Sequence, residues 1–215
     1  MKATVQSRIG YYFITDAGLS RLGNTSDVKN ALLAKVKFVQ YRVKHLSTKE
    51  MYQEALQLKK ICRKAVFLVN DRLDIALAVN ADGVHLGQDD LSYQVARKLL
   101  GEKKIIGITV HSVKEAKEAQ RLGADYLGVS PIFATSTKQD AGKPTGTALL
   151  KKIREEVSIP IVAIGGINLS NAVEVIRAGA DGLCAISAVV TKRDVRREIE
   201  KFQGLFENTA RGKVS

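Results

Sequence analysis

The sequence lacks the features that mark membrane, secreted and disulfide-bonded proteins. Its apolar runs are short, and one of the longest, residues 159–164, cannot span a bilayer. The first ten residues hold no apolar core of the kind that a signal peptide needs. The two cysteines, Cys62 and Cys184, have neither a metal-ligand spacing nor a redox-motif spacing, so we expect reduced, buried thiols. These absences favour a cytoplasmic protein.

The chain also lacks a linker and a dinucleotide-binding fingerprint. No stretch rich in Pro, Gly and Ser divides its 215 residues, a length that fits one large α/β domain or two small ones. With 45% hydrophobic and 26% charged residues, its composition is that of an ordinary globular protein. No Gly-x-Gly-x-x-Gly motif follows the first predicted strand, which argues against a doubly wound open sheet.

Acidic residues are fewer than basic ones, and the formal net charge is +12. Anionic small-molecule substrates, nucleic acid and a lysine-rich solvated surface are the three explanations. The basic residues are scattered along predicted helices, and the basic run at residues 192–197 has no interleaved aromatic residue and contains Asp194. We therefore assign most of the charge to a solvated surface and expect neither a nucleic-acid nor a membrane partner. The oligomeric state is left open.

Strand and helix patterns alternate from end to end. Eight short, mostly apolar runs are typical of parallel strands that are buried on both faces. They cover residues 11–15, 38–42, 65–70, 83–86, 105–109, 126–130, 160–164 and 182–186. Eight such units in a chain of this length predict a single-domain α/β fold over residues 1–215, a (β/α)8 TIM barrel with a frayed tail at 206–215. All strands of a barrel end at one face, which should carry the site.

Local signals mark the joints between helices and strands. The capping-box spacing occurs at Ser47 with Glu50 and at Ser112 with Glu115. Gly123 and Gly179 are expected to end their helices in the left-handed conformation. An Ala-Asp pair precedes three predicted strands, at Asp82, Asp125 and Asp181. We interpret these aspartates as structural residues that satisfy backbone groups on the face away from the chemistry.

Polar residues follow the second predicted strand. Because residues two apart in a strand point the same way, Gln40 and Arg42 should share a face, and Lys44 joins them if the chain stays extended. Two cations in this arrangement suit an anion. The alternative is a strand edge paired with acidic residues of neighbouring helices.

Carboxylates follow the next two strands. Asn70 and Asp71 come after the third, and Asp89 and Asp90 come after the fourth, before a helical pattern at 91–100. We expect Asp89 or Asp90 to be the N-cap of that helix. Neighbouring carboxylates are unfavourable unless a cation lies between them. Mg²⁺ takes one or two carboxylates with waters and phosphate oxygens, so Asp71 and Asp90 predict a magnesium site.

The later strands end in groups suited to phosphate. A long polar loop after the sixth strand contains Thr135, Ser136, Thr137 and Lys138, whose hydroxyls and ammonium form either a phosphate cradle or a plain flexible loop. Gly165 and Gly166 follow the seventh strand and Ser187 follows the eighth, where barrels often bind phosphate through backbone N–H groups.

Thr109 and then His111 follow the fifth strand, and His111 is a further candidate, although a lone histidine is more often a packed or surface residue. No activated nucleophile is apparent. The residues therefore predict an enzyme for phosphorylated substrates that works by positioning and electrostatics with a divalent metal.

The segments around these residues together resemble the thiamine-phosphate synthase family. The resemblance covers about residues 11–188, and its most specific parts are Gln88-Asp89-Asp90 and Thr135-Ser136-Thr137-Lys138. It implies a transferase that joins hydroxymethylpyrimidine diphosphate to hydroxyethylthiazole phosphate, or its carboxylate form, giving thiamine phosphate and pyrophosphate. It also implies Mg²⁺ at Asp71 and Asp90.

The resemblance assigns residues to both substrates. Those for the pyrimidine diphosphate are Gln40, Tyr41, Arg42, Val43, Lys44, Asn70, Thr109 and Lys138. Those for the thiazole phosphate are Thr135, Ser136, Thr137, Gly166, Ile186 and Ser187. Among these residues, Arg42, Lys44 and Lys138 are the expected catalytic groups, because a leaving diphosphate gains negative charge as its bond breaks.

The chain departs from the family pattern at a few positions. Val43 stands where the family usually carries Glu, and Thr109 stands where it usually carries Ser, which keeps the hydroxyl. Ser130 and Ala134 replace a common Gly and a common Pro. A thiazole tautomerase of the same barrel family is the alternative function. Because a tautomerase need not keep the metal carboxylates, retention of Asp71 with Asp90 and Lys138 favours the synthase.

Overall fold

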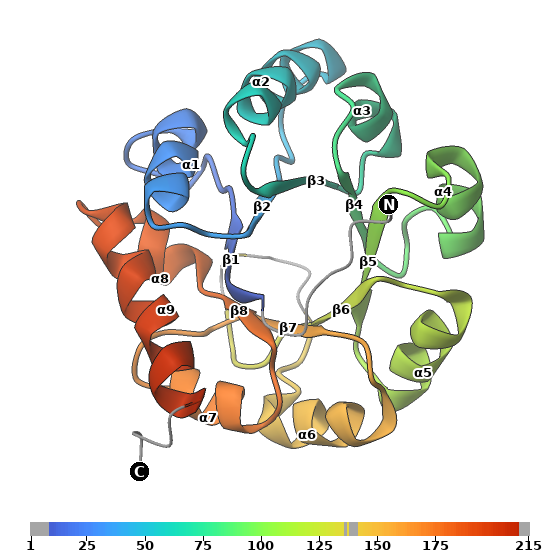
Figure 1. The fold of residues 1–215 in the computed structure, drawn as a ribbon, viewed down its shortest axis with the longest axis vertical. Helices are drawn as coiled ribbons and strands as arrows, with labels where there is room; N and C mark the ends of the chain where they lie inside the picture. The colour runs from blue at the N-terminus through green and yellow to red at the C-terminus, as the bar shows by residue number, and fades with distance from the viewer. Residues whose placement is uncertain (1–8, 136, 138–141, 211–215) are drawn as a thin grey trace.

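In the computed structural model, which describes residues 9–135, 137 and 142–210, eight parallel strands close into one barrel (Figure 1). The strands are β1 (Gly10–Ile14), β2 (Phe38–Tyr41), β3 (Val66–Asn70), β4 (Gly83–Leu86), β5 (Ile105–Val110), β6 (Tyr126–Val129), β7 (Ile161–Ile164) and β8 (Gly182–Cys184). Each strand pairs with the next in the chain, and β8 pairs with β1. The predicted single-domain TIM barrel is confirmed, with strand ends shifted by one or two residues.

Helices surround the barrel as an outer ring (Figure 1). They are α1 (Asn24–Leu33), α2 (Thr48–Ile61), α3 (Leu73–Ala78), α4 (Tyr93–Leu100), α5 (Val113–Leu122), α6 (Gly146–Glu156), α7 (Ala172–Arg177), α8 (Ile186–Val190) and α9 (Val195–Ala210). Within the described ranges, no helix is both long enough and apolar enough to cross a membrane.

Two predicted ends are wrong. The eighth strand stops at Cys184, and Ile186 and Ser187 lie in the first turn of α8 instead. The tail does not begin to fray at Phe206, because α9 continues to Ala210 and buries the Phe206 ring against the outer core. Residues 211–215 lie outside the described ranges.

Two apolar layers hold the barrel together. Alternate residues of β1 show the division: Tyr11 and Phe13 pack outward against the helices, while Tyr12 and Ile14 pack inside the barrel. Both faces of the sheet are buried, which explains why the strands read as continuous apolar runs rather than alternating ones. The inner layer includes Cys184, and both cysteines are free and buried, as expected.

The capping signals are confirmed with one difference. Ser47 and Glu50 form a reciprocal capping box at the start of α2. Ser112 caps α5 through its hydroxyl, but the Glu115 carboxylate accepts the N–H of His111, one residue before the cap. Gly123 ends α5 in the left-handed conformation, with a φ of 97°.

The predicted N-cap of α4 is wrong. Ser92, rather than Asp89 or Asp90, caps this helix by accepting the N–H of Val95. The Asp90 carboxylate instead accepts the N–H of Gly87 at 2.7 Å, which closes the turn after β4. Asp90 is therefore left at the mouth of the barrel.

The three joint aspartates each tie two strands together, as predicted. Each carboxylate lies before one strand and accepts a backbone N–H at the start of the preceding strand, which satisfies a buried donor. The pairs are Asp82 with Phe67 at 2.8 Å, Asp125 with Ile106 at 2.9 Å and Asp181 with Ile161 at 2.9 Å. Each carboxylate also pairs with a cation from an earlier helix: Lys59, Arg97 and Arg154 respectively.

Replacing Asp125 with alanine should destabilise the fold by about 3 kcal/mol or more, because it leaves a buried cation without its partner. Arg97 Nη2 lies 2.7 Å from Asp125 Oδ2, and the two side chains are only 10% and 9% exposed. Urea denaturation measures the change in the free energy of unfolding. The control is Glu118→Ala, which removes an exposed ion pair with Arg121 and should cost far less, because water screens this pair. Equal losses in both variants would contradict this account.

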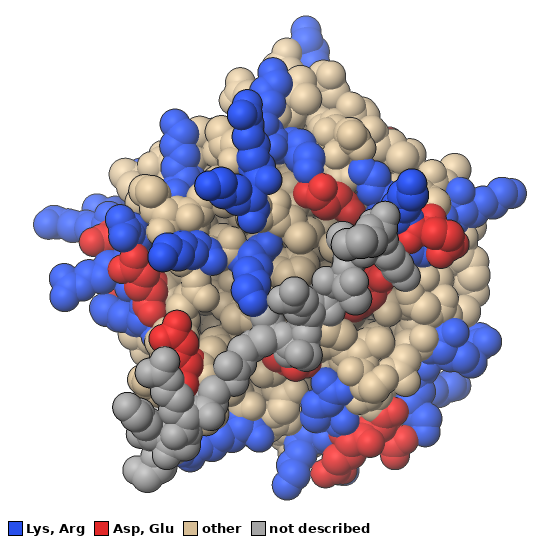
Figure 2. Space-filling model, in the orientation of Figure 1, with Lys and Arg blue, Asp and Glu red and all other residues tan. Residues whose placement is uncertain are grey.

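The surface charge is dispersed, as the sequence analysis predicts. Figure 2 shows Lys and Arg side chains projecting from many parts of the face in view, with Asp and Glu among them. Several are in ion pairs, for example Lys117 with Glu156 and Arg196 with Glu200. This pattern is that of a solvated surface with mixed charges.

Candidate active site

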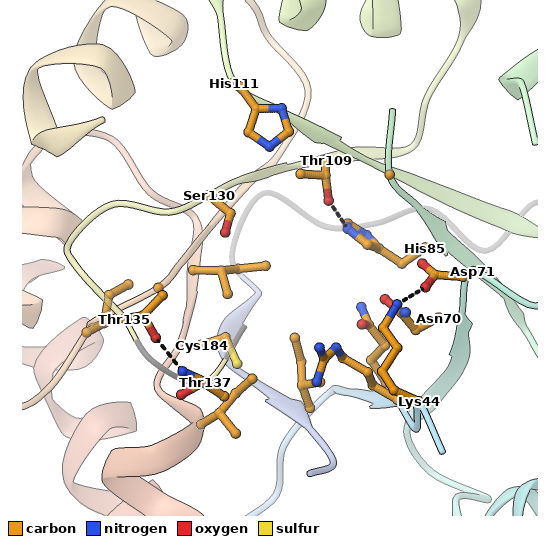
Figure 3. A pocket seen from close by; sticks show the side chains of 18 of the residues that line it. Lys44, Asn70, Asp71, His85, Thr109, His111, Ser130, Thr135, Thr137 and Cys184 are labelled. Atoms are coloured by element: carbon orange, nitrogen blue, oxygen red, sulfur yellow. Dashed lines mark hydrogen bonds and ion pairs between the residues drawn. The ribbon is translucent and has the colours of Figure 1, made fainter. Parts of the chain in front are cut away.

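The carboxyl ends of the strands surround a cavity of about 280 Å³ (Figure 3). Side chains from every strand, or from the loop that follows it, line its wall. The predicted site residues that the structure brings there are Gln40, Arg42, Lys44, Asn70, Asp71, Asp90, Thr109, Thr135, Thr137, Gly166, Ile186 and Ser187. The expectation that distant strand ends gather at one mouth is confirmed.

Two predicted residues of the described chain, Tyr41 and Val43, do not line this cavity. The Tyr41 side chain points to the opposite face of β2 and donates its hydroxyl to Glu54 Oε2 at 2.7 Å. Burial, and the Glu54 carboxylate beside it, raise the pKa of this phenol. Val43 packs against the outer apolar layer. The side chains of Tyr41 and Val43 face away because residues two apart in an extended segment point the same way. Two further predicted residues, Ser136 and Lys138, lie outside the described residues.

Arg42 is held over the cavity by the loop after β1. Thr15 Oγ1 accepts the backbone N–H of Arg42 at 2.9 Å and donates to its carbonyl at 3.1 Å. The Arg42 guanidinium lies 3.5 Å from Asp16 Oδ2, and its side chain is 15% exposed. The Asp16 contact is long for an ion pair, so among the described residues it leaves most of the guanidinium's donors available to a ligand.

Lys44, Asp71 and Asp90 form a charged group beside Asn70. Lys44 Nζ lies 2.7 Å from Asp71 Oδ2, and the two side chains point toward one another (Figure 3). The carboxylates of Asp71 and Asp90 lie close enough to shift each other's pKa. Asp71 has a φ of 61°, a left-handed conformation that non-glycine residues rarely adopt. This turn brings Asp71 toward Asp90.

The two carboxyl groups differ in acidity. Burial raises the pKa of Asp71, but hydrogen bonds with Lys44 and Asp90 outweigh it and the net pKa is lowered. Burial and the negative charge of Asp71 raise the pKa of Asp90, although the Gly87 N–H opposes them. Such a pair shares a proton or a cation, because two adjacent carboxylates repel each other when both are ionised.

This donor set fits Mg²⁺. No cluster of three or more His, Cys, Asp or Glu side chains able to hold a metal occurs among residues 9–135, 137 and 142–210. A closed all-protein cage is therefore not built from this part of the chain. Two adjacent carboxylates at an open mouth match the way Mg²⁺ is held, with waters and substrate phosphates completing its shell. Asp71 and Asp90 are the residues that would bind it.

A second polar group lies across the cavity from Lys44 and Asp71. Figure 3 shows Thr135 and Thr137 on this side, where the N–H of Thr137 donates to Thr135 Oγ1 at 3.2 Å. Gly166 has a φ of 65°, and a Cβ there would lie 2.5 Å from the carbonyl oxygen of Ala134. Only glycine permits this contact between the two loops. The cavity therefore has two polar ends.

His85 is a site residue that the sequence analysis missed. It lies inside the apolar run of β4, is 4% exposed and lines the cavity floor. Its Nε2 lies 2.8 Å from Thr109 Oγ1 (Figure 3). The signal that marks it is a polar side chain in a strand that is otherwise buried. His111 also lines the cavity, but its Nδ1 lies 3.4 Å from the Glu115 carboxylate in an exposed pair.

Comparison with known proteins agrees with this arrangement. A family model described as thiamine monophosphate synthase matches residues 11–189. The chain belongs to this family. It is 51% identical to the thiamine-phosphate synthase of Methanosarcina barkeri over 209 residues, covering 97% of this chain and 95% of that protein. It is 53% identical to the enzyme of Methanosarcina mazei over 203 residues, covering 94% and 85%.

A solved structure has the same fold. The thiamine phosphate pyrophosphorylase of Pyrococcus furiosus superposes with a TM-score of 0.85 at 42% identity, covering 93% of this chain and 96% of that one. Membership of the thiamine monophosphate synthase family thus extends over nearly the whole chain. The tautomerase alternative is not favoured, because the curated relatives are named as synthases.

Proposed function

We propose that this protein is a thiamine-phosphate synthase, a transferase that joins hydroxymethylpyrimidine diphosphate to hydroxyethylthiazole phosphate. The observation that carries the proposal is one cavity with cations and paired carboxylates at one end and a glycine-rich polar end opposite. Two anionic substrates need such ends. Family membership supports the same reaction. We expect the enzyme to work in the cytoplasm on small phosphorylated molecules.

The diphosphate end would hold the leaving group. In the reaction, the bond between the pyrimidine methylene carbon and the diphosphate oxygen breaks, and the thiazole nitrogen attacks that carbon. Negative charge grows on the departing diphosphate. Arg42 and Lys44 stabilise this charge more in the transition state than in the ground state, which accelerates the reaction. Lys138, which the sequence assigns to the same role, lies outside the described residues.

The paired carboxylates would also stabilise the leaving diphosphate. Asp71 and Asp90 would hold Mg²⁺, which supplies positive charge to phosphate oxygens when it is bound. Lys44 bridges to Asp71 at 2.7 Å, so its ammonium can turn from this carboxylate to a phosphate. Asn70 lies beside the group and offers an amide to the same ligand.

The opposite end would hold the thiazole phosphate. The backbone of Gly166, the hydroxyls of Thr135 and Thr137, and Ser187 at the start of α8 line this end. A phosphate fixed here would place the thiazole ring against the pyrimidine. The thiazole nitrogen then captures the electrophilic carbon before water does, because the two reactants are held together.

Turnover by the purified protein tests the proposal. We expect thiamine phosphate and pyrophosphate to form in equal amounts from the two substrates with Mg²⁺, measured by chromatography. A mixture without protein is the control. Absence of thiamine phosphate, with both substrates recovered intact, would refute the proposal. Isomerisation of the carboxylated thiazole phosphate, supplied alone, would favour the tautomerase instead.

A further inference from the structure

A continuous line of hydrogen bonds crosses the barrel beneath the cavity. It joins five side chains from five strands, in the order Gln40, Tyr12, Tyr126, His85 and Thr109. Gln40 Nε2 lies 2.9 Å from Tyr12 Oη, and the two phenol oxygens lie 2.7 Å apart. Tyr126 Oη lies 2.8 Å from His85 Nδ1, and His85 Nε2 lies 2.8 Å from Thr109 Oγ1. We call this line the floor chain.

The floor chain is built into the barrel. A Cβ at Gly107 would lie 2.1 Å from the Tyr126 ring, and one at Gly128 would lie 2.9 Å from His85 Cε1. Both strands therefore need glycine at these points to make room for the chain. Tyr12 is also fixed, because its ring stacks on Phe38 with centroids 5.7 Å apart. These contacts hold the polar atoms in place.

The donor at Gln40 selects one direction for the hydrogen bonds of the floor chain. Burial raises the pKa values of Tyr12 and Tyr126, so both phenols keep their protons. Gln40 Nε2 donates to Tyr12, and the Tyr12 proton is then directed at Tyr126. A buried hydroxyl without an acceptor is costly, which favours this order.

The same order continues to the other end. In this order the Tyr126 proton is donated to His85 Nδ1, and a neutral His85 carries its proton on Nε2 and donates it to Thr109 Oγ1. The Thr109 proton is thereby left for a ligand, because this hydroxyl lines the cavity. Gln40 also lines the cavity, and its Oε1 is left as an acceptor. The opposite polarity requires all the groups to turn together.

We propose that Tyr12, Tyr126 and His85 are positioning residues that couple Gln40 to Thr109. The cavity then prefers a flat heterocycle with a donor facing Gln40 and an acceptor facing Thr109. An aminopyrimidine has an amino donor and ring-nitrogen acceptors. A pyrimidine in which an oxo group replaces the amino group reverses this pattern. The choice of ligand rests on the proposed function, and the direction of the floor chain rests on the Gln40 amide donating to Tyr12.

The test compares the affinities of hydroxymethylpyrimidine diphosphate and its oxo analogue by calorimetry with Mg²⁺. The wild-type protein should prefer the amino compound by about 100-fold or more, because the analogue leaves polar groups unpaired. Tyr126→Phe cuts the floor chain, so its preference should fall to about tenfold or less. A purely structural role would weaken both ligands alike and leave the preference unchanged.

Tyr11→Phe is the matched control. Tyr11 is the neighbour of Tyr12 on β1 and is equally buried, but it faces outward and donates to the carbonyl of Ala185 at 3.1 Å. This variant should keep the wild-type preference. If Tyr126→Phe does not fold, as judged by circular dichroism, Tyr12→Phe cuts the floor chain at another link and should show the same loss.

Either of two results would overturn the inference: no preference in the wild-type protein, or a wild-type preference in the cut variants. The measurement uses neither the thiazole substrate nor turnover. A protein that shows the expected preference but forms no thiamine phosphate would therefore refute the proposed function alone.

Discussion

Asp71→Asn should lower kcat by about 100-fold or more, because the amide keeps the shape of the carboxylate but loses the charge that binds Mg²⁺. It should also raise the Mg²⁺ concentration needed for half-maximal rate. The change releases Lys44, which lies 2.7 Å from Asp71 in the wild-type protein. Steady-state kinetics over a range of Mg²⁺ concentrations measures both effects.

Asp74→Asn is the control for this prediction. Asp74 lies in α3, three residues further along the chain, where it pairs with Arg72 and its side chain is 58% exposed. Its removal should leave both kcat and the Mg²⁺ requirement near wild-type values. A wild-type rate in Asp71→Asn would remove this residue from the metal site.

Arg42→Gln should lower kcat/KM for the pyrimidine diphosphate by about 100-fold, the effect of removing one preorganised charge from a developing anion. Arg42→Lys restores the charge but not the planar fork of donors, so it should recover only part of the loss. The KM for the thiazole phosphate should change little, because that phosphate is assigned to the loops after β6 and β7, whereas Arg42 follows β2. Initial rates with each substrate varied in turn measure the difference.

The control for Arg42 is Arg121→Gln. Arg121 is 68% exposed on α5, where it pairs with Glu118, so its loss should leave catalysis unchanged. A loss in Arg42→Gln that falls equally on both substrates would instead indicate a general disturbance of the barrel mouth.

The fold was predictable because its signals are local. Each strand is a short apolar run, and each run is buried on both faces in the barrel. The ends were harder where two local signals compete. Asp90 and Ser92 are both suitable N-cap residues. Ser92 caps α4, whereas the Asp90 carboxylate accepts the N–H of Gly87 and closes the turn after β4. The sequence at Phe206 shows no strong pattern, but its ring packs on the outer layer.

The candidate site was predictable in part for a topological reason. A barrel brings all strand ends to one face, so Gln40, Asp71 and Gly166 are expected together although they are far apart in the chain. The resemblance assigns the whole segment from Gln40 to Lys44, but the Tyr41 side chain faces away from the cavity because alternate residues of β2 face opposite sides.

The floor chain shows what a single sequence leaves undetermined. Tyr12 and Tyr126 stand in different strands and look like ordinary core aromatics. Their hydroxyls meet only because β1 and β6 face each other across the barrel. The Tyr126 ring fits between them because Gly107 has no side chain in its way. Contacts of this kind depend on the closed sheet and not on any local pattern.

Anomalous diffraction from a crystal soaked with Mn²⁺ and pyrophosphate tests the central claim most directly. The account predicts a Mn²⁺ peak bound by Asp71 and Asp90, with the pyrophosphate on the same ion and within hydrogen-bond distance of Arg42. A Mn²⁺ peak away from both carboxylates, or pyrophosphate bound outside the mouth of the barrel, would contradict it.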